Sequence, residues 1–140
     1  MMRGQEVHAA TYIRKRRMVL DRALLKNAAE LRRILIHELF HFAWVRLGNA
    51  RRAGYEAVVR REMEERGRGE LGWSAEMRKR RLPAGEGRRW REYVCESFCD
   101  TGAWLYAGVK RHDEYTLAAR FRTKRAAWFA RALGGGAVRV

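Results

Sequence analysis

Two histidines and a glutamate in the run HELFH at 37–41 have the spacing of a catalytic metal site. Residues four apart on an α-helix project from the same face, so His37 and His41 can bind one metal ion. Neutral imidazole nitrogen is a good ligand for Zn²⁺, and two histidines leave room for a third side chain and a water molecule. Glu38, about 100° further round the helix, can act as general base on that water without binding the metal.

The alternative for this run is a pair of helical histidines that only form hydrogen bonds. The flanking residues are uncharged, and two imidazoles and a carboxylate are costly to bury unless they bind something. We therefore favour a zinc site with His37 and His41 as ligands and Glu38 as the base.

A third ligand is expected from residues 95–100, CESFCD. Glu96 and Asp100 share one face of the predicted helix, and Cys95 and Cys99 share the adjacent face. We expect only one of these faces to point at the histidines. If Glu96 does, the site is an open hydrolytic centre, and Asp100 would accept a hydrogen bond from a ligand imidazole.

If the cysteines point at the histidines, the site is Cys₂His₂, closed and structural. The chain would then be a non-enzymatic basic protein that binds nucleic acid or an acidic partner. We favour Glu96, because a structural site leaves Glu38 without a role and small cysteines are common in buried helix packing.

The runs at 37–41 and 96–100 resemble the zincin metallopeptidases, and within them the gluzincins typified by thermolysin. The uncharged flanks 35–36 and 42–43 are similar to the longer zincin signature. The resemblance implies a minimal zinc peptidase acting on peptide or protein substrates, with Glu96 as third ligand and Asp100 supporting a histidine. It also implies an upstream strand that pairs with the substrate backbone, for which residues 8–13 or 17–21 are candidates.

Gluzincins commonly use a Tyr or His to stabilise the oxyanion that forms during attack. No spacing selects among the candidates in this chain, which are Tyr93, Tyr106, His112 and Tyr115. His112 is also a reserve third ligand. His8 is expected to be a solvated histidine in a strand.

The N-terminal part of the chain predicts a hairpin followed by a long helix. Strands are expected at about 8–13 and 17–21, joined by a turn at the basic run 14–17. Asn27 has the position of an N-cap, with Glu30 in capping-box position, for a helix from 28 to 47. The apolar centre of that helix predicts that it lies buried in the middle of the domain.

The rest of the chain predicts further helices. They are expected at 55–66, at 74–81 with Ser74 as cap, at 88–107, and from Asp113 to Leu133. The fold class is α+β: one mainly helical, zincin-like domain over 1–140, with a short N-terminal hairpin packed on the helix of the active site.

Charge and cysteine content bear on partners and compartment. The chain has 31 Lys and Arg against 16 Asp and Glu, a net charge of +15, which attracts polyanions. Because the basic residues are dispersed, a solvated arginine-rich surface is the simpler interpretation. Two cysteines are too few for a secreted disulfide framework, and no apolar run has signal-peptide or membrane-spanning length, so we expect a cytoplasmic protein. A tail at 134–140 that inhibits the site is a further possibility.

Overall fold

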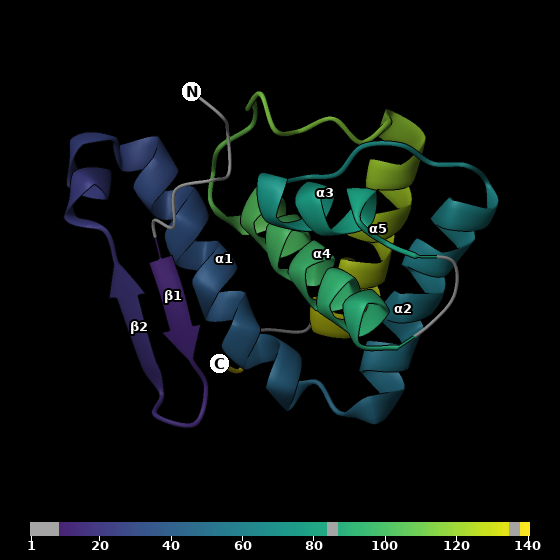
Figure 1. The fold of residues 1–140 in the computed structure, drawn as a ribbon, viewed down its shortest axis with the longest axis horizontal. Coiled ribbons are helices and arrows are strands. Elements are labelled where there is room, and N and C mark those ends of the chain that lie inside the picture. Colours follow the sequence, from purple (N-terminus) through teal and green to yellow (C-terminus); the bar gives the residue numbers. More distant parts are fainter. Residues whose placement is uncertain (1–8, 84–86, 135–137) are drawn as a thin grey trace.

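The protein is described by a computed structural model that covers residues 9–83, 87–134 and 138–140. Within these residues the chain forms one two-stranded antiparallel sheet and five α-helices (Figure 1). The predicted fold class, mainly helical α+β with an N-terminal hairpin, is confirmed. Across the same residues, none of the helices combines the length and the apolar character needed to cross a bilayer.

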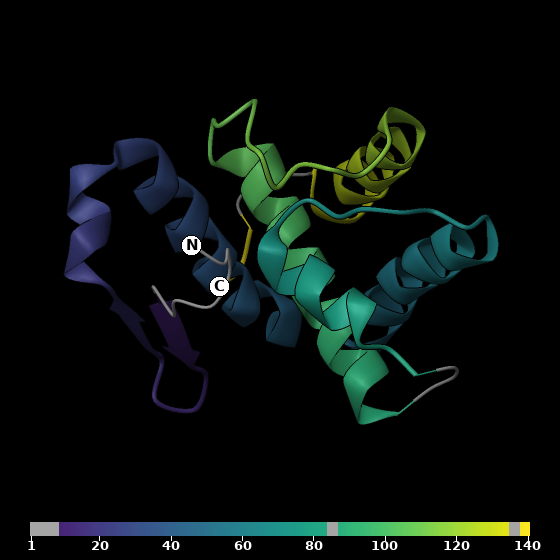
Figure 2. The same ribbon diagram turned by 45° about the horizontal axis from the view of Figure 1, so that its top comes forward.

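The hairpin consists of β1 (Ala9–Tyr12) and β2 (Arg17–Leu20), with Thr11 opposite Met18. The basic turn between them is confirmed: the Arg16 amide donates to the carbonyl of Ile13 at 3.1 Å, and Arg16 has a positive φ of 48°. β1 lies between β2 and α1 (Ala28–Arg46) in both views (Figures 1 and 2). His8, at the start of the predicted strand, lies outside the described residues.

Helix α1 begins as the sequence predicts. Asn27 Oδ1 accepts the Glu30 amide at 3.2 Å, which satisfies one of the first amides of the helix. The Glu30 side chain does not complete a capping box, since it binds Arg33 and His112. A 3-10 turn, η1 (Arg22–Lys26), precedes the helix.

Two short connections differ from the prediction. Helix α2 (Asn49–Glu64) starts directly after Gly48, whose φ of 83° lets the chain turn out of α1. Helix α3 (Trp73–Arg80) has Gly72 as its N-cap, so the prediction that Ser74 caps this helix is wrong. Ser74 lies in the first turn, and its hydroxyl donates to Glu96 Oε1.

Helix α4 (Arg88–Tyr106) matches its prediction, whereas α5 (Ala119–Leu133) starts six residues later than the predicted cap at Asp113. The segment before α5 has other partners. The amides of Thr116 and Leu117 both donate to the Glu70 carbonyl, and Leu117 is 1% exposed. Pairing with the loop at residue 70 therefore replaces the extra helical turn.

Helix α4, rather than α1, is the most buried helix and packs against α1, α2 and α3 (Figure 2). Its Phe98 ring lies 5.5 Å from the Phe40 ring of α1 and 5.1 Å from the Phe129 ring of α5. A Cβ at Gly102 would lie 2.5 Å from the Phe40 ring, so this glycine permits the close approach of α1 and α4. That approach brings the histidines of α1 to α4.

Candidate metal centre

The two histidines of α1 meet one glutamate of α4. His37 Nε2 lies 3.2 Å from Glu96 Oε1, and His41 Nε2 lies 3.3 Å from Glu96 Oε2. The His37 side chain is 12% exposed and that of His41 is 20% exposed. The cluster is thus largely enclosed but reachable from the His41 side.

These spacings suit a tetrahedral metal ion. With zinc–ligand bonds of about 2.0–2.2 Å, neighbouring ligand atoms of a tetrahedron lie roughly 3.3–3.6 Å apart. The two distances from Glu96 lie at or just below the lower end of that range, which is also the upper end of the range for N–H···O hydrogen bonds. Two imidazoles and one carboxylate are a donor set that zinc accepts, so the residues fit this ion by type. Among the described residues, the sets whose ligand atoms all lie within 4.8 Å of one another pair the histidines with Glu38 or with the cysteines, and not with Glu96.

Asp100 fixes the orientation of His37. Its Oδ1 lies 2.6 Å from His37 Nδ1, and its Oδ2 accepts the Ala75 amide of α3 at 2.9 Å. A Cβ at Gly72 would lie 2.3 Å from Asp100 Cγ, so a side chain there would displace the carboxylate. With Nδ1 held by Asp100, His37 presents Nε2 for a metal.

Helix α3 supports the third proposed ligand. Ser74 Oγ donates to Glu96 Oε1 at 2.6 Å. Arg78 in turn donates to Ser74 Oγ at 2.8 Å, and its guanidinium lies 3.9 Å from Glu96 Oε1. Ser74 and Arg78 therefore hold the Glu96 carboxylate toward α1.

Glu38, the proposed general base, is held by the hairpin. Thr11 Oγ1 lies 2.5 Å from Glu38 Oε2 and 3.3 Å from the Glu38 carbonyl oxygen. The same Oε2 is 4.0 Å from His41 Nε2. The carboxylate is thus next to the histidine pair and is linked to β1.

The cysteines also reach the site, contrary to the expectation that only one face of α4 would do so. Cys95 Sγ lies 3.8 Å from His41 Nδ1, on the opposite side of the ring from Glu96. His41, Cys95 and Cys99 have potential ligand atoms within 4.8 Å of one another, as do His37, Glu38 and His41. Cys95 and Glu96 are adjacent on the side of α4 that faces α1, so both contact the ring of His41.

The pKa values of the two histidines and of Glu96 depend on one another. Burial acts to lower the pKa of His37, but the carboxylates of Asp100 and Glu96 raise it well above 6.5. Burial also opposes protonation of His41, yet hydrogen bonds with Cys95 and Glu96 raise its pKa to about 10. Burial tends to raise the pKa of Glu96, and the two histidines lower it well below its ordinary value. Within the cluster, the carboxylate of Glu96 thus favours the protonated form of both imidazoles.

The thiols of α4 differ from each other. The hydrogen bond from Cys99 is the main cause that lowers the pKa of Cys95; burial opposes it, and His41 adds to it, giving about 6. Burial, followed by the contact with Cys95, raises the pKa of Cys99 well above 9. Cys95 is thus the thiolate of the pair, next to His41.

The four candidates for stabilising an oxyanion have their contacts elsewhere. The hydroxyl of Tyr93 donates to Glu70, and that of Tyr115 donates to the Val109 carbonyl. His112 lies 2.5 Å from Glu30 Oε1, which does not suit a role as metal ligand. The Tyr106 ring stacks on Phe40 and is 46% exposed. Arg78 is the cationic side chain that the structure brings beside Glu96.

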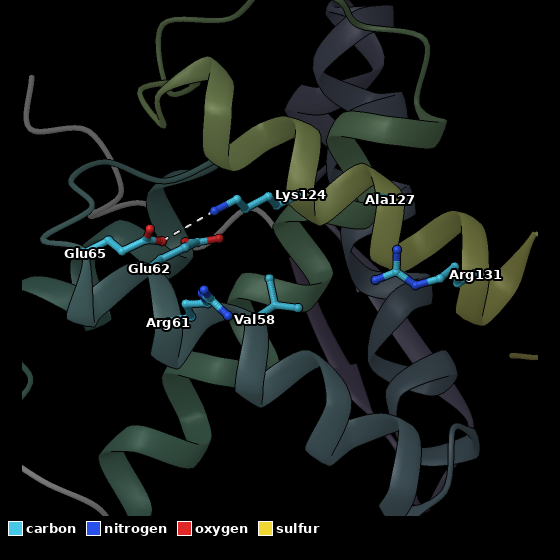
Figure 3. A pocket seen from close by; sticks show the side chains of 7 residues that line it. All are labelled: Val58, Arg61, Glu62, Glu65, Lys124, Ala127 and Arg131. Atoms are coloured by element: carbon cyan, nitrogen blue, oxygen red, sulfur yellow. Dashed lines mark ion pairs between the residues drawn. The ribbon is translucent and has the colours of Figure 1, made fainter.

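A surface groove of about 340 Å³ lies between α2 and α5, and its lining includes none of the proposed site residues (Figure 3). Its charged lining is mixed, since Lys124 pairs with Glu65 at 3.5 Å and Glu62 binds the buried Arg125. Arg61 and Arg131 add positive charge. The groove is a feature of the basic surface and is separate from the metal cluster.

Three residues at the site escape sequence reasoning: Thr11, Gly72 and Arg78. Their partners are 27, 28 and 18 positions away in sequence, at Glu38, Asp100 and Glu96 respectively. Ser74 carried a signal, a short polar residue at the start of a helix, but that signal predicted capping and not contact with Glu96. None of these contacts follows from a local pattern.

Comparison of the chain with known protein families, curated proteins and solved structures found no match. The resemblance to zincins therefore depends on the sequence runs at 37–41 and 96–100 alone.

Proposed function

We propose that the protein is a zinc-dependent hydrolase, most specifically a peptidase of the gluzincin type, with His37, His41 and Glu96 as zinc ligands. The observation that carries the proposal is the convergence of both Nε2 atoms on the two Glu96 oxygens, at 3.2 and 3.3 Å. The donor set favours an open catalytic site, because these three side chains would fill three of the four coordination positions of zinc and leave the fourth for water.

Zinc bound there would supply a Lewis acid for water and for the scissile carbonyl. Glu38 would take a proton from the attacking water and deliver it to the leaving amine. Asp100 would keep the His37 ring in the orientation that presents Nε2, and Ser74 would orient Glu96.

The substrate would be a peptide or protein segment that lies along β1. This strand pairs with β2 and packs beside α1, and its Thr11 contacts Glu38, so a peptide held along the strand would lie close to the proposed base. Backbone pairing of this kind gives affinity with little sequence preference. Both cysteines are free thiols, which suits the cytoplasm as the site of action.

The decisive experiment is cleavage of a quenched fluorescent peptide library by the zinc-loaded chain. Glu38→Gln should lower the rate at least about a hundredfold while one zinc per chain is retained. Glu92→Gln, the same change on the exposed side of α4, is the matched control and should keep the rate. Absence of cleavage by both the zinc-loaded wild type and the zinc-loaded chain without 134–140, or full activity of Glu38→Gln, would exclude this function.

A structural zinc site is the second candidate, and the contact of Cys95 with His41 is the observation in its favour. In this alternative the protein would be a basic, non-enzymatic partner of nucleic acid or another polyanion. His37 argues against it, because its two ring nitrogens lie next to Asp100 and Glu96.

Ligand variants separate the two candidates. In the hydrolase, Glu96→Ala should weaken zinc binding far more than the double change Cys95→Ser and Cys99→Ser. In the structural site the order is reversed. Anomalous scattering at the zinc edge from crystals of the loaded protein would give the ligands directly.

Inhibition by the C-terminal tail belongs to the same proposal. Arg16 Nη2 donates to the Val140 carbonyl at 3.1 Å, and Val138 packs against the main core, which keeps the described end of the tail near α1 and the hairpin (Figure 1). Residues 135–137 lie outside the described residues. Removal of 134–140 should raise peptidase activity if the tail inhibits; unchanged activity would contradict inhibition.

A further inference from the structure

The hydroxyl of Thr11 is the link between the hairpin and the proposed general base. Its Oγ1 lies 2.5 Å from Glu38 Oε2, across 27 residues of sequence, and β1 otherwise belongs to a separate two-stranded sheet. Glu38 is 8% exposed. A short hydrogen bond from a hydroxyl to a buried carboxylate is among the stronger neutral–charged contacts in a protein.

This bond has a specific consequence for the carboxylate. The terminal torsion of a glutamate is broad and roughly two-fold, so the two oxygens exchange easily unless something holds one of them. Thr11 binds Oε2, the oxygen that also lies 4.0 Å from His41 Nε2, so the hydroxyl fixes the rotation of the carboxylate beside the histidine pair. The hydroxyl also lies 3.3 Å from the Glu38 backbone carbonyl, so it contacts the backbone of α1 as well as the Glu38 side chain.

The position of Thr11 on the strand adds a second consequence. In the function proposed above the substrate lies along β1, so a bound peptide would act on the strand that holds the base. We infer that Thr11 is a positioning residue that aligns Glu38 for proton transfer and couples this alignment to the binding of peptide on β1. This inference rests on the hydrolase function proposed above.

The test compares three variants of the zinc-loaded full chain. Thr11→Val keeps the shape and the strand preference of threonine but replaces the hydroxyl donor with a methyl group. Thr11→Ala removes the hydroxyl without adding a methyl group, and Thr11→Ser keeps the hydroxyl. We expect kcat to fall roughly tenfold to a hundredfold for Val and Ala, because small errors in the placement of reacting groups have effects of this size. KM and zinc affinity should stay within about twofold, and Ser should recover most of kcat.

Thr123→Val is the matched control. Its hydroxyl donates to the Ala119 carbonyl within α5, far from the site in sequence, so kcat should not change. Thermal unfolding of each variant followed by circular dichroism checks that the fold is kept.

A binding measurement gives a readout that does not depend on turnover. A peptide hydroxamate needs the carboxylate base to take its proton, whereas a peptide thiol binds chiefly through sulfur on the metal. Thr11→Val should weaken the hydroxamate at least about fivefold relative to the thiol, in line with the loss of one charge-assisted hydrogen bond.

The outcomes separate this inference from the function on which it rests. Wild-type kcat in Thr11→Val, equal loss in Thr11→Ser, or equal loss of both inhibitors would overturn the role of Thr11 while the hydrolase stands. Failure of the zinc-loaded protein to cleave any peptide, both with and without residues 134–140, would remove the hydrolase and the inference together.

Discussion

Asp100 bridges the histidine of α1 and the first turn of α3: one oxygen lies 2.6 Å from His37 Nδ1 and the other accepts the Ala75 amide at 2.9 Å. Three helices are therefore joined at one buried carboxylate. A histidine that binds a metal through one ring nitrogen is usually oriented by the hydrogen bond that its other ring nitrogen makes. Several expected results follow from this arrangement and from its neighbours.

Asp100→Asn should weaken zinc binding by about tenfold to a hundredfold, because a neutral amide is a poorer acceptor for the His37 ring N–H. The change keeps the size of the side chain, and competition with a chromophoric chelator measures the affinity. Glu92→Gln, an equal loss of one charge on the exposed part of α4, should leave the affinity unchanged. Equal affinities in both variants would show that Asp100 does not orient the ligand.

Gly72→Ala should disturb the site although no ligand is altered. Its Cβ would stand 2.3 Å from Asp100 Cγ, and the backbone of α3 cannot move away without losing the Ala75 contact. We expect a loss of about 1–3 kcal/mol in the free energy of unfolding, as for other overpacked positions, together with weaker zinc binding. Chemical denaturation with and without zinc measures both, and wild-type values would contradict the close packing at Asp100.

The metal-free protein should lose stability as the pH rises from about 6.5 to about 10. Across this window the folded chain keeps a proton on His41, whose pKa is about 10, while the unfolded chain releases it near 6.5. The stabilisation is therefore complete below pH 6.5 and is lost as the pH approaches 10; His37 acts in the same direction.

Zinc should remove this pH dependence, because the ligand histidines must be neutral to bind it. At pH 7, calorimetric titration in buffers of different ionisation enthalpy should detect protons released on zinc binding. Glu96→Gln removes the carboxylate that favours the protonated rings, so fewer protons should be released. Zinc binding without proton release would contradict the assignment of the two imidazoles as ligands.

Arg125→Met should destabilise the fold by about 3–5 kcal/mol, because it leaves two buried carboxylates without their cation. Arg125 is fully buried and donates to both oxygens of Glu62 and both oxygens of Glu70, at 2.7–2.9 Å. The triple variant with Glu62→Gln and Glu70→Gln should regain part of the loss. Urea unfolding measures the free energy of unfolding of each variant. If Arg125→Met is as stable as wild type, the ion pairs of Arg125 with Glu62 and Glu70 contribute nothing to stability.

Local patterns predicted the elements that depend on local chemistry. The hairpin, the cap at Asn27 and the extents of α1 and α4 follow from side-chain periodicity and from hydrogen bonds between near neighbours. The start of α5 did not, because the amides of Thr116 and Leu117 donate to the carbonyl of Glu70, a partner over 40 positions away. Likewise, the hydroxyl of Ser74, near the start of α3, binds Glu96 and does not cap the helix.

For the candidate site, helix geometry relates residues a few positions apart, so local spacing was enough to place His37 and His41 on one helix face with Glu38 beside them. It also predicted a third ligand on one of two adjacent faces of α4, with His112 in reserve. The packing of the helices then brings Glu96 next to both Nε2 atoms, while Cys95 contacts the other side of His41. That choice depends on the rotation and approach of two helices, which the packing of Phe40 on Gly102 determines. The hold of Thr11 on Glu38 has the same origin, since side chains 27 positions apart meet only when the sheet packs on α1.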